Sequence, residues 1–114
     1  MSFLFAGQDS TAVALSSLFC FIAANPSVQA KLVLELEEVL GDSENVEWRQ
    51  LSKLKYLDWC IKETLRLVPP VPGIFKRAEL DCAIVSQTGG KPYKIDKKTN
   101  LFLSFLPLHM DTQT

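Results

Sequence analysis

The stretch at residues 62–77, "KETLRLVPPVPGIFKR", divides the sequence into two parts with different patterns. Its first residues continue a run of apolar side chains at helical spacing. The prolines then end the helix, because proline lacks an amide hydrogen and restricts the residue before it. From Gly73 onward the apolar runs are short, favour β-structure and are separated by glycine and lysine. Helices followed by short strands predict a mainly α fold with a small β part, an α+β arrangement.

Proline, glycine and apolar spacing also predict where the other elements begin and end. Asn25 is placed to cap the second helix, Pro26 suits its first position, and Gly41 ends it. The predicted helices are residues 2 (or 10) to 24, 26–40 and 56 to 67 or 68. The polar face of the second helix, expected to lie largely outside, comprises Lys31, Glu35 and Glu38. The antiparallel strands are expected within residues 73–78, 81–85, 93–95 and 100–106.

Composition and charge bound the class of protein. The chain has 114 residues, which is at most one ordinary domain, and 47% are hydrophobic, as in a globular protein with a core. The net charge is −1 without a stripe of lysine and arginine, so we expect no nucleic-acid partner. The uncharged run at residues 12–24 is shorter than the ~20 residues of a membrane-spanning helix. Asp9 is the only charge before that run, whereas a signal peptide has a basic start.

The third predicted helix carries an acid and a base on the side opposite its apolar face. Glu63 and Arg66 are spaced i, i+3, so their side chains can pair. One interpretation is a solvated surface ion pair of small energetic value. Trp59 favours another, because its large ring on the same side indicates a covered face, and a covered ion pair needs further hydrogen-bonding partners. The apolar face comprises Leu57, Ile61, Leu65 and Val68, with Cys60 and Leu67 beside it.

Several segments resemble, in the right order, the cytochromes P-450, the haem-thiolate monooxygenases. The stretch at 62–77 resembles the helix with the family's Glu-x-x-Arg motif and the proline-rich segment after it. The segment "FAGQDST" at 5–11 resembles the oxygen-activating motif, Ala/Gly-Gly-x-Asp/Glu-Thr-Thr/Ser. The segments "NPSVQAKLVLELEEVLG" at 25–41 and "LSKLKYLDWCIKETLR" at 51–66 resemble the helix that follows that motif and the approach to the Glu-x-x-Arg helix. "LHMD" at 108–111 resembles the His-Arg-Asp-Pro stretch.

The resemblance implies that residues 1–114 are an internal fragment of one cytochrome P-450 domain, without its N-terminal part and its cysteine-ligand loop. It implies a parent enzyme that uses haem (iron protoporphyrin IX), dioxygen and electrons from a reductase to hydroxylate a small apolar substrate. The parent is expected at the endoplasmic reticulum membrane. The isolated chain is expected to be inactive and without haem. The alternative is a non-catalytic helical binding or regulatory fragment that has lost haem.

By resemblance, the catalytic residues are Asp9, Ser10 and Thr11, beside an oxygen-binding groove at Ala6 and Gly7. A hydroxyl at Ser10 can bond the carbonyl of Ala6 and widen that turn of the helix, and Gly7 leaves room for a close approach. Asp9 would supply a titratable proton store. The family usually has threonine where this chain has Ser10, so the hydroxyl loses a methyl that limits its rotamers. The alternative is that Asp9 caps a helix that begins at Ser10.

The remaining site residues are also assigned by resemblance. Glu63 and Arg66 would form a structural network with a segment outside this chain, and Lys76 or Arg77 would contact a haem propionate, since a guanidinium suits a carboxylate. Ile74 and Phe75 would lie near the substrate pocket. The metal site is expected to be absent from this chain, because the family's axial cysteine lies in a later loop. The residues that lack this context are Cys20, Cys60 and Cys82, expected as free, buried, reduced thiols, and His109, at best an adventitious ligand.

Overall fold

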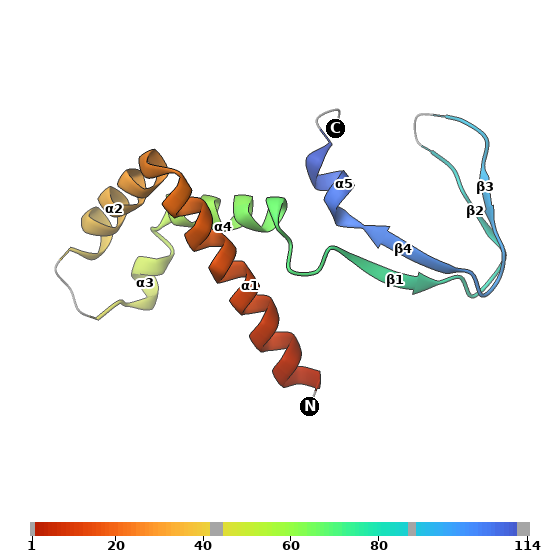
Figure 1. Ribbon diagram of the computed structural model, residues 1–114, viewed down its shortest axis with the longest axis horizontal. Helices are drawn as coiled ribbons and strands as arrows, with labels where there is room; N and C mark the ends of the chain where they lie inside the picture. Colours follow the sequence, from red (N-terminus) through yellow and green to blue (C-terminus); the bar gives the residue numbers. More distant parts are fainter. Residues whose placement is uncertain (1, 42–44, 87–88, 112–114) are drawn as a thin grey trace. The chain divides into compact units, whose positions relative to one another are not determined.

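The computed structural model describes residues 2–41, 45–86 and 89–111, and the chain divides into two compact units, Met1–Pro70 and Val71–Thr114 (Figure 1). The first unit is helical and the second contains short antiparallel strands and one short helix. The mainly α fold with a small β part that the sequence predicts is therefore confirmed. The helices of the first unit are α1 (Ser2–Ala24), α2 (Pro26–Leu40), α3 (Trp48–Leu51) and α4 (Lys55–Leu67).

The ends of these helices follow local sequence signals with one exception. α1 begins at Ser2, so a helix that begins at Ser10 is excluded. Pro26 occupies the first turn of α2, and Gly41, at φ 58°, ends that helix. Asn25 occupies the predicted cap position of α2, but its side chain makes no capping hydrogen bond. Its Nδ2 donates instead to the carbonyl of Phe21 at 2.8 Å. The start of α2 depends instead on proline geometry and on the Asn25 carbonyl, which accepts from Val28 at 2.9 Å.

The core of the first unit is small and lies where α1, α2 and α4 meet. Leu18, Leu32 and Leu54 are buried, with exposed fractions of 7%, 5% and 5%. The buried Thr64 hydroxyl donates to the carbonyl of Cys60 at 2.8 Å, which satisfies its polar atom inside the helix. The apolar face of α4 is only partly covered, because Ile61 and Leu65 keep more than a third of their surface exposed.

The second unit consists of two separate pairs of antiparallel strands. Strands β1 (Gly73–Arg77) and β4 (Asn100–Ser104) form one pair, in which Gly73 lies opposite Ser104. Strands β2 (Cys82–Ile84) and β3 (Tyr93–Ile95) form the other. Gly73 is required by close approach, since a Cβ there would lie 2.6 Å from the Phe102 ring and would also meet the Leu103 carbonyl oxygen. Phe75 and Phe102 pack with ring centroids 4.8 Å apart.

The last strand is shorter than the sequence predicts, because a helix replaces its end. β4 stops at Ser104, and α5 (Phe105–Met110) follows, so the predicted strand at residues 105 and 106 is wrong. The Phe105 amide donates to the Pro72 carbonyl at 2.8 Å, in the same register as β1 and β4. Pro72 has no amide hydrogen to return a bond, so the ladder ends at this pair. Pro107 lies in the first turn of α5, where its missing amide hydrogen costs no helical hydrogen bond.

Within the described part of the chain, no single helix combines the length and the apolar character needed to cross a membrane. The pair Ala6–Ala24 and Pro26–Leu40 meets both criteria together, but the two helices are bent at 109° to each other.

Candidate functional site

The acid and the two hydroxyls of the first motif lie on consecutive positions of α1. The Ser10 hydroxyl donates to the carbonyl oxygen of Ala6 at 2.5 Å, which confirms the contact predicted from the sequence. The Thr11 hydroxyl makes the same contact with the carbonyl of Gly7, at 2.7 Å, which was not predicted. Both hydroxyl protons are therefore committed to the helix backbone. The hydroxyl oxygens keep their lone pairs free to accept a hydrogen bond from the surface of the helix.

The turn of α1 at this motif is not widened, contrary to the prediction. α1 is one uninterrupted α-helix from Ser2 to Ala24. A carbonyl oxygen has two lone pairs, so Ala6 and Gly7 can accept from a hydroxyl and from a helical amide at once. Asp9 stands inside this helix, seven residues after its start, so its interpretation as a helix cap is also wrong.

The surface around this motif is open. A Cβ added to Gly7 would meet no atom within 4 Å, and Ala6, Gly7, Asp9 and Thr11 are all exposed, with Ser10 half-buried. α1 thus supplies one wall of the predicted groove, and among the described residues nothing lies within 4 Å of a Cβ at Gly7.

The second motif lies on α4 and forms a two-point ion pair. Arg66 donates from Nε to Glu63 Oε2 at 2.8 Å and from Nη2 to Glu63 Oε1 at 2.7 Å, which confirms the predicted pairing. The hydrogen bond from Arg66 lowers the pKa of the Glu63 carboxyl. The side chains of Arg66 and Glu63 are 42% and 57% exposed, and Trp59 is 61% exposed. The described residues therefore do not cover this face of α4, although Trp59 led us to expect a covered face.

The ion pair between Asp58 and Lys62, also on α4, has a different geometry. Lys62 Nζ lies 2.6 Å from Asp58 Oδ2, a one-point contact at i, i+4, with side chains 70% and 53% exposed. Such pairs contribute little to stability. The bidentate fork at Glu63 and Arg66 fixes the plane of the guanidinium, so it can present that group in one direction.

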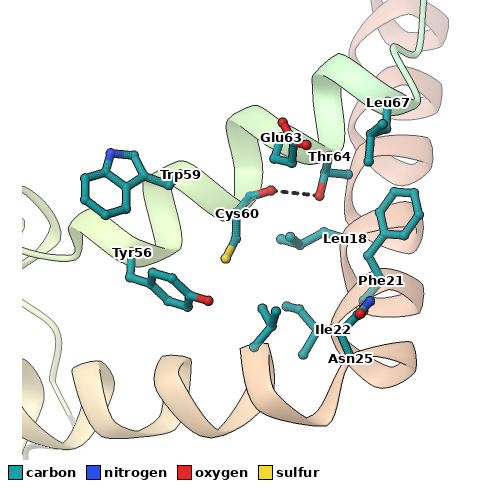
Figure 2. A pocket seen from close by; sticks show the side chains of 11 residues that line it. Leu18, Phe21, Ile22, Asn25, Tyr56, Trp59, Cys60, Glu63, Thr64 and Leu67 are labelled. Atoms are coloured by element: carbon teal, nitrogen blue, oxygen red, sulfur yellow. Dashed lines mark hydrogen bonds between the residues drawn. The ribbon is translucent and has the colours of Figure 1, made fainter. Parts of the chain in front are cut away.

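Helices α1, α2 and α4 enclose a hollow of about 350 Å³ beside the second motif (Figure 2). Figure 2 shows Tyr56 and Cys60 projecting from α4 into it, with Leu18 and Ile22 of α1 opposite. Burial raises the pKa of the Cys60 thiol, and the nearby charge of Glu35 raises it further. Cys60 is therefore a protonated, packed thiol, as expected from the sequence.

The carboxylate of Glu35 is the feature of this region that sequence reasoning missed. The prediction that Glu35 lies outside is wrong, because it is half-buried and accepts hydrogen bonds from the backbone amides of Tyr56 and Leu57, at 2.7 and 2.9 Å. A signal was present in the sequence, since Leu54 precedes α4 and its apolar side chain cannot cap a helix. An unsatisfied helix start of this kind requires an acceptor from elsewhere.

The other predicted site residues lie on β1, in the second unit. All four are exposed, including Phe75 at 79%. Because side chains alternate along a strand, Ile74 and Lys76 share one face and Phe75 and Arg77 share the other. Each face of β1 therefore carries one apolar and one basic side chain, and a site on one face can use only that pair.

The three cysteines are free thiols and are spread over both units. Cys60 is partly buried, but Cys20 and Cys82 are exposed, so the expectation that these two thiols are buried is wrong. In residues 2–41, 45–86 and 89–111, no three histidine, cysteine or acidic side chains come together in a way that could hold a metal ion.

Comparison with known proteins gives one consistent family. The Cytochrome P450 family model matches residues 1–114. Cytochrome P450 4V2 of Mus musculus is 41% identical over 111 residues, which are 96% of this chain and 20% of that protein. Cytochrome P450 4A12B of Mus musculus is 36% identical over 108 residues, 95% of this chain and 20% of that protein. The chain spans about a fifth of the length of these curated relatives.

A solved structure agrees with the sequence comparisons. The crystal structure of a cytochrome P450 designated CYP102L1 superposes with a TM-score of 0.83 at 29% identity, covering 96% of this chain and 24% of that one.

Proposed function

Because this chain belongs to the cytochrome P450 family, we propose that it is an internal part of a longer haem-dependent monooxygenase. The family match over residues 1–114 supports this proposal, as does the length of the relatives, of which the chain spans about a fifth. The parent protein activates dioxygen with electrons from a reductase and hydroxylates a small apolar substrate. Its place is the endoplasmic reticulum membrane. Residues 1–114 are one part of its single domain, with the axial cysteine loop outside this part.

The surface of α1 at the first motif fits the approach of a flat prosthetic group. Gly7 has open space in front of it, and the hydroxyls of Ser10 and Thr11 bond back to the helix, so none of these described side chains blocks the surface at Gly7. When bound, haem supplies the redox chemistry that reduces dioxygen. Lys76 or Arg77 would hold a propionate of the group from the second unit. Ile74 and Phe75 would line the substrate pocket.

The chain's own contribution at this surface is the handling of protons. While the Ser10 hydroxyl donates a hydrogen bond to the Ala6 carbonyl, its oxygen accepts a hydrogen bond from a water beside the helix. Asp9, the preceding residue, holds and releases a proton to that water. Serine rotates more freely than threonine, because it lacks the methyl that limits the threonine side chain. Ser10 can therefore turn from the carbonyl toward the water and donate.

The ion pair on α4 has a structural role in the same proposal. The fork between Glu63 and Arg66 presents a fixed guanidinium plane to a further segment of the parent protein. Neither residue touches the reacting atoms. The isolated chain is proposed to be inactive and without haem, and the raised pKa of Cys60, which disfavours a thiolate, supports this.

The observation that carries the proposal is the acid, serine and threonine on one continuous helix beside an open glycine. It is tested in the full-length protein by Ser10→Ala. Product formation is expected to fall by roughly 10²- to 10⁴-fold, with haem content unchanged, because only proton delivery is removed. Ser16→Ala is the matched control, an exposed serine on the same helix. Unchanged product formation in Ser10→Ala would contradict the assignment.

A further inference from the structure

The start of α4 has no capping side chain of its own. The residue before the helix is Leu54, which is buried and makes no side-chain hydrogen bond to the helix. The first amides of any helix lack partners within the helix and require acceptors from outside it. Leu54 contributes an apolar contact to the core but leaves these amides unsatisfied.

Glu35 of α2 supplies the missing acceptors from another helix. Its Oε1 accepts from the Tyr56 amide at 2.7 Å and its Oε2 from the Leu57 amide at 2.9 Å. Both oxygens of one carboxylate are used, and the contact is partly buried. A negative charge at the start of a helix is also favourable, because the helix dipole is positive there. The separation of these residues in the chain means that the contact ties two helices together.

A second contact joins the same two places. The ammonium of Lys31, one turn before Glu35 on α2, lies 5.9 Å from the centre of the Tyr56 ring. Tyr56 is therefore held at its amide by a carboxylate and at its ring by a cation, both from α2. Tyr56 thus contacts one anionic and one cationic side chain of α2. Together these contacts restrict sliding of α4 along α2 and rotation of α4 about its axis.

We propose that Glu35 is a positioning residue, which fixes the place and rotation of α4 and thereby aims the Glu63–Arg66 pair. This inference rests on the proposed function, since the direction of that pair matters only if it meets a further segment of a haem protein. The members of the pair follow Tyr56 on α4 after 7 and 10 residues, about 10 and 15 Å along the helix. A helix is stiff over this length, so a shift at Tyr56 also moves the pair.

The test uses the full-length protein and compares Glu35→Gln with Glu38→Gln. Both changes remove one negative charge from α2, but Glu38 is exposed and Glu35 is half-buried at the α4 amides. Hydrogen exchange at Tyr56 and Leu57 is expected to quicken by roughly 10- to 100-fold in Glu35→Gln, since hydrogen bonds to a charged acceptor are lost. Glu38→Gln is expected to match the wild type. Equal exchange in the two variants would overturn the inference.

The second readout separates positioning from simple stabilisation. Under conditions where both variants are fully folded, the thiolate-type Soret band of the reduced, carbon-monoxide-bound protein is measured per haem. A purely structural role leaves this band unchanged in folded protein, whereas misaligned α4 is expected to convert part of it to a shorter-wavelength band. An unchanged band in Glu35→Gln overturns the positioning role. A wild-type protein without the band overturns the proposed function instead, while the exchange measurement still tests the contact.

Glu35→Asp provides a milder variant should Glu35→Gln fold poorly. Aspartate keeps the charge but is one methylene shorter, so it is expected to lose the two-point contact. Exchange at Tyr56 and Leu57 should then lie between those of the wild type and Glu35→Gln. Wild-type exchange in Glu35→Asp would show that charge alone suffices, and would contradict the positioning by geometry.

Discussion

The two motif regions of the first unit differ in how much of their surroundings this chain supplies. At residues 6–11 of α1, the hydroxyls bond only to their own helix and the neighbouring surface is open. On α4, the first turn is bonded to Glu35 of α2, and Thr64 is buried. The first region is a regular helix, and the described residues leave the surface beside its motif open. The second is a helix already placed by its neighbours.

This difference teaches that the two motifs depend on the rest of a protein for different things. The acid and hydroxyls of α1 need a second wall before they can act on any ligand. The Glu63–Arg66 pair is already formed in this chain, and the segment that we propose it meets lies elsewhere in the parent protein. Disturbing α4 should therefore affect assembly, whereas disturbing α1 should affect chemistry and leave assembly intact.

The largest effect is expected from Glu63→Ala in the full-length protein. Removing the carboxylate takes away the two-point contact of Arg66, which the proposed further segment would cover. Haem-loaded protein is expected to fall by at least about tenfold, because a covered charge that loses a close counter-charge is strongly destabilising. Haem content per protein, measured after purification, checks this prediction.

Asp58→Ala is the control for that experiment. Asp58 belongs to the exposed pair with Lys62 on the same helix, and its loss should leave haem content close to that of the wild type. Normal haem content in Glu63→Ala would contradict the network role. Equal loss in both variants would mean that any damage to α4 suffices.

A smaller effect, with opposite signs in two settings, is expected from Gly7→Ala. In the 114-residue chain a methyl at this position meets nothing within 4 Å, so the substitution Gly7→Ala should stabilise α1 by up to ~1 kcal/mol. In the full-length protein the methyl should occupy the surface next to haem and lower product formation. Denaturant unfolding of the chain and turnover of the full-length protein measure the two signs.

Gly41→Ala is the contrasting control for Gly7→Ala. Gly41 also has open space around it, but its φ of 58° is strained for alanine, so destabilisation is expected. A loss of stability in both variants of the 114-residue chain would contradict the open surface at Gly7. Unchanged turnover of full-length Gly7→Ala would contradict the groove.

The smallest effect concerns the titration of Glu63. Its pKa is lowered mainly by the hydrogen bond from Arg66, so the stabilisation by the pair is present above the ordinary carboxyl pKa and is lost as the pH falls through the lowered value. Arg66→Gln should raise the midpoint of Glu63 toward that of an ordinary glutamate. The carboxyl resonance followed by NMR measures this, with Lys62→Gln as the control. A midpoint that stays where it was would mean that the fork does not persist in solution.

Local signals in the sequence predicted most of the fold. Pro26, Gly41 and the prolines after Val68 act on their own neighbours, so the helices could be placed from them. The pairing of Glu63 with Arg66 was also predictable, because i, i+3 spacing brings side chains together on any helix. Asn25 does precede α2 at the cap position, but its side-chain oxygen makes no capping hydrogen bond, and its Nδ2 donates to the preceding helix.

What could not be predicted depends on contacts between distant residues. Glu35 is 21 residues from Tyr56, and nothing on its own helix distinguishes it from its exposed neighbours. The predicted strand ends early because its partner at Phe105 is Pro72, a residue distant in the chain that cannot donate the next ladder bond, and helix α5 follows. The groove at Gly7 could not be established for the same reason, since its second wall is not among the described residues.

The central claim is that the motifs of this chain are shaped locally but form a haem-thiolate centre only within a longer protein. The most direct test records the Soret region after haem, reductant and carbon monoxide are added to the 114-residue chain and to the full-length protein. We predict the thiolate-type band, the family's spectral signature, for the full-length protein, and a shorter-wavelength band or free haem for the chain alone. A thiolate-type band from the chain alone, or its absence from the full-length protein, would contradict the claim.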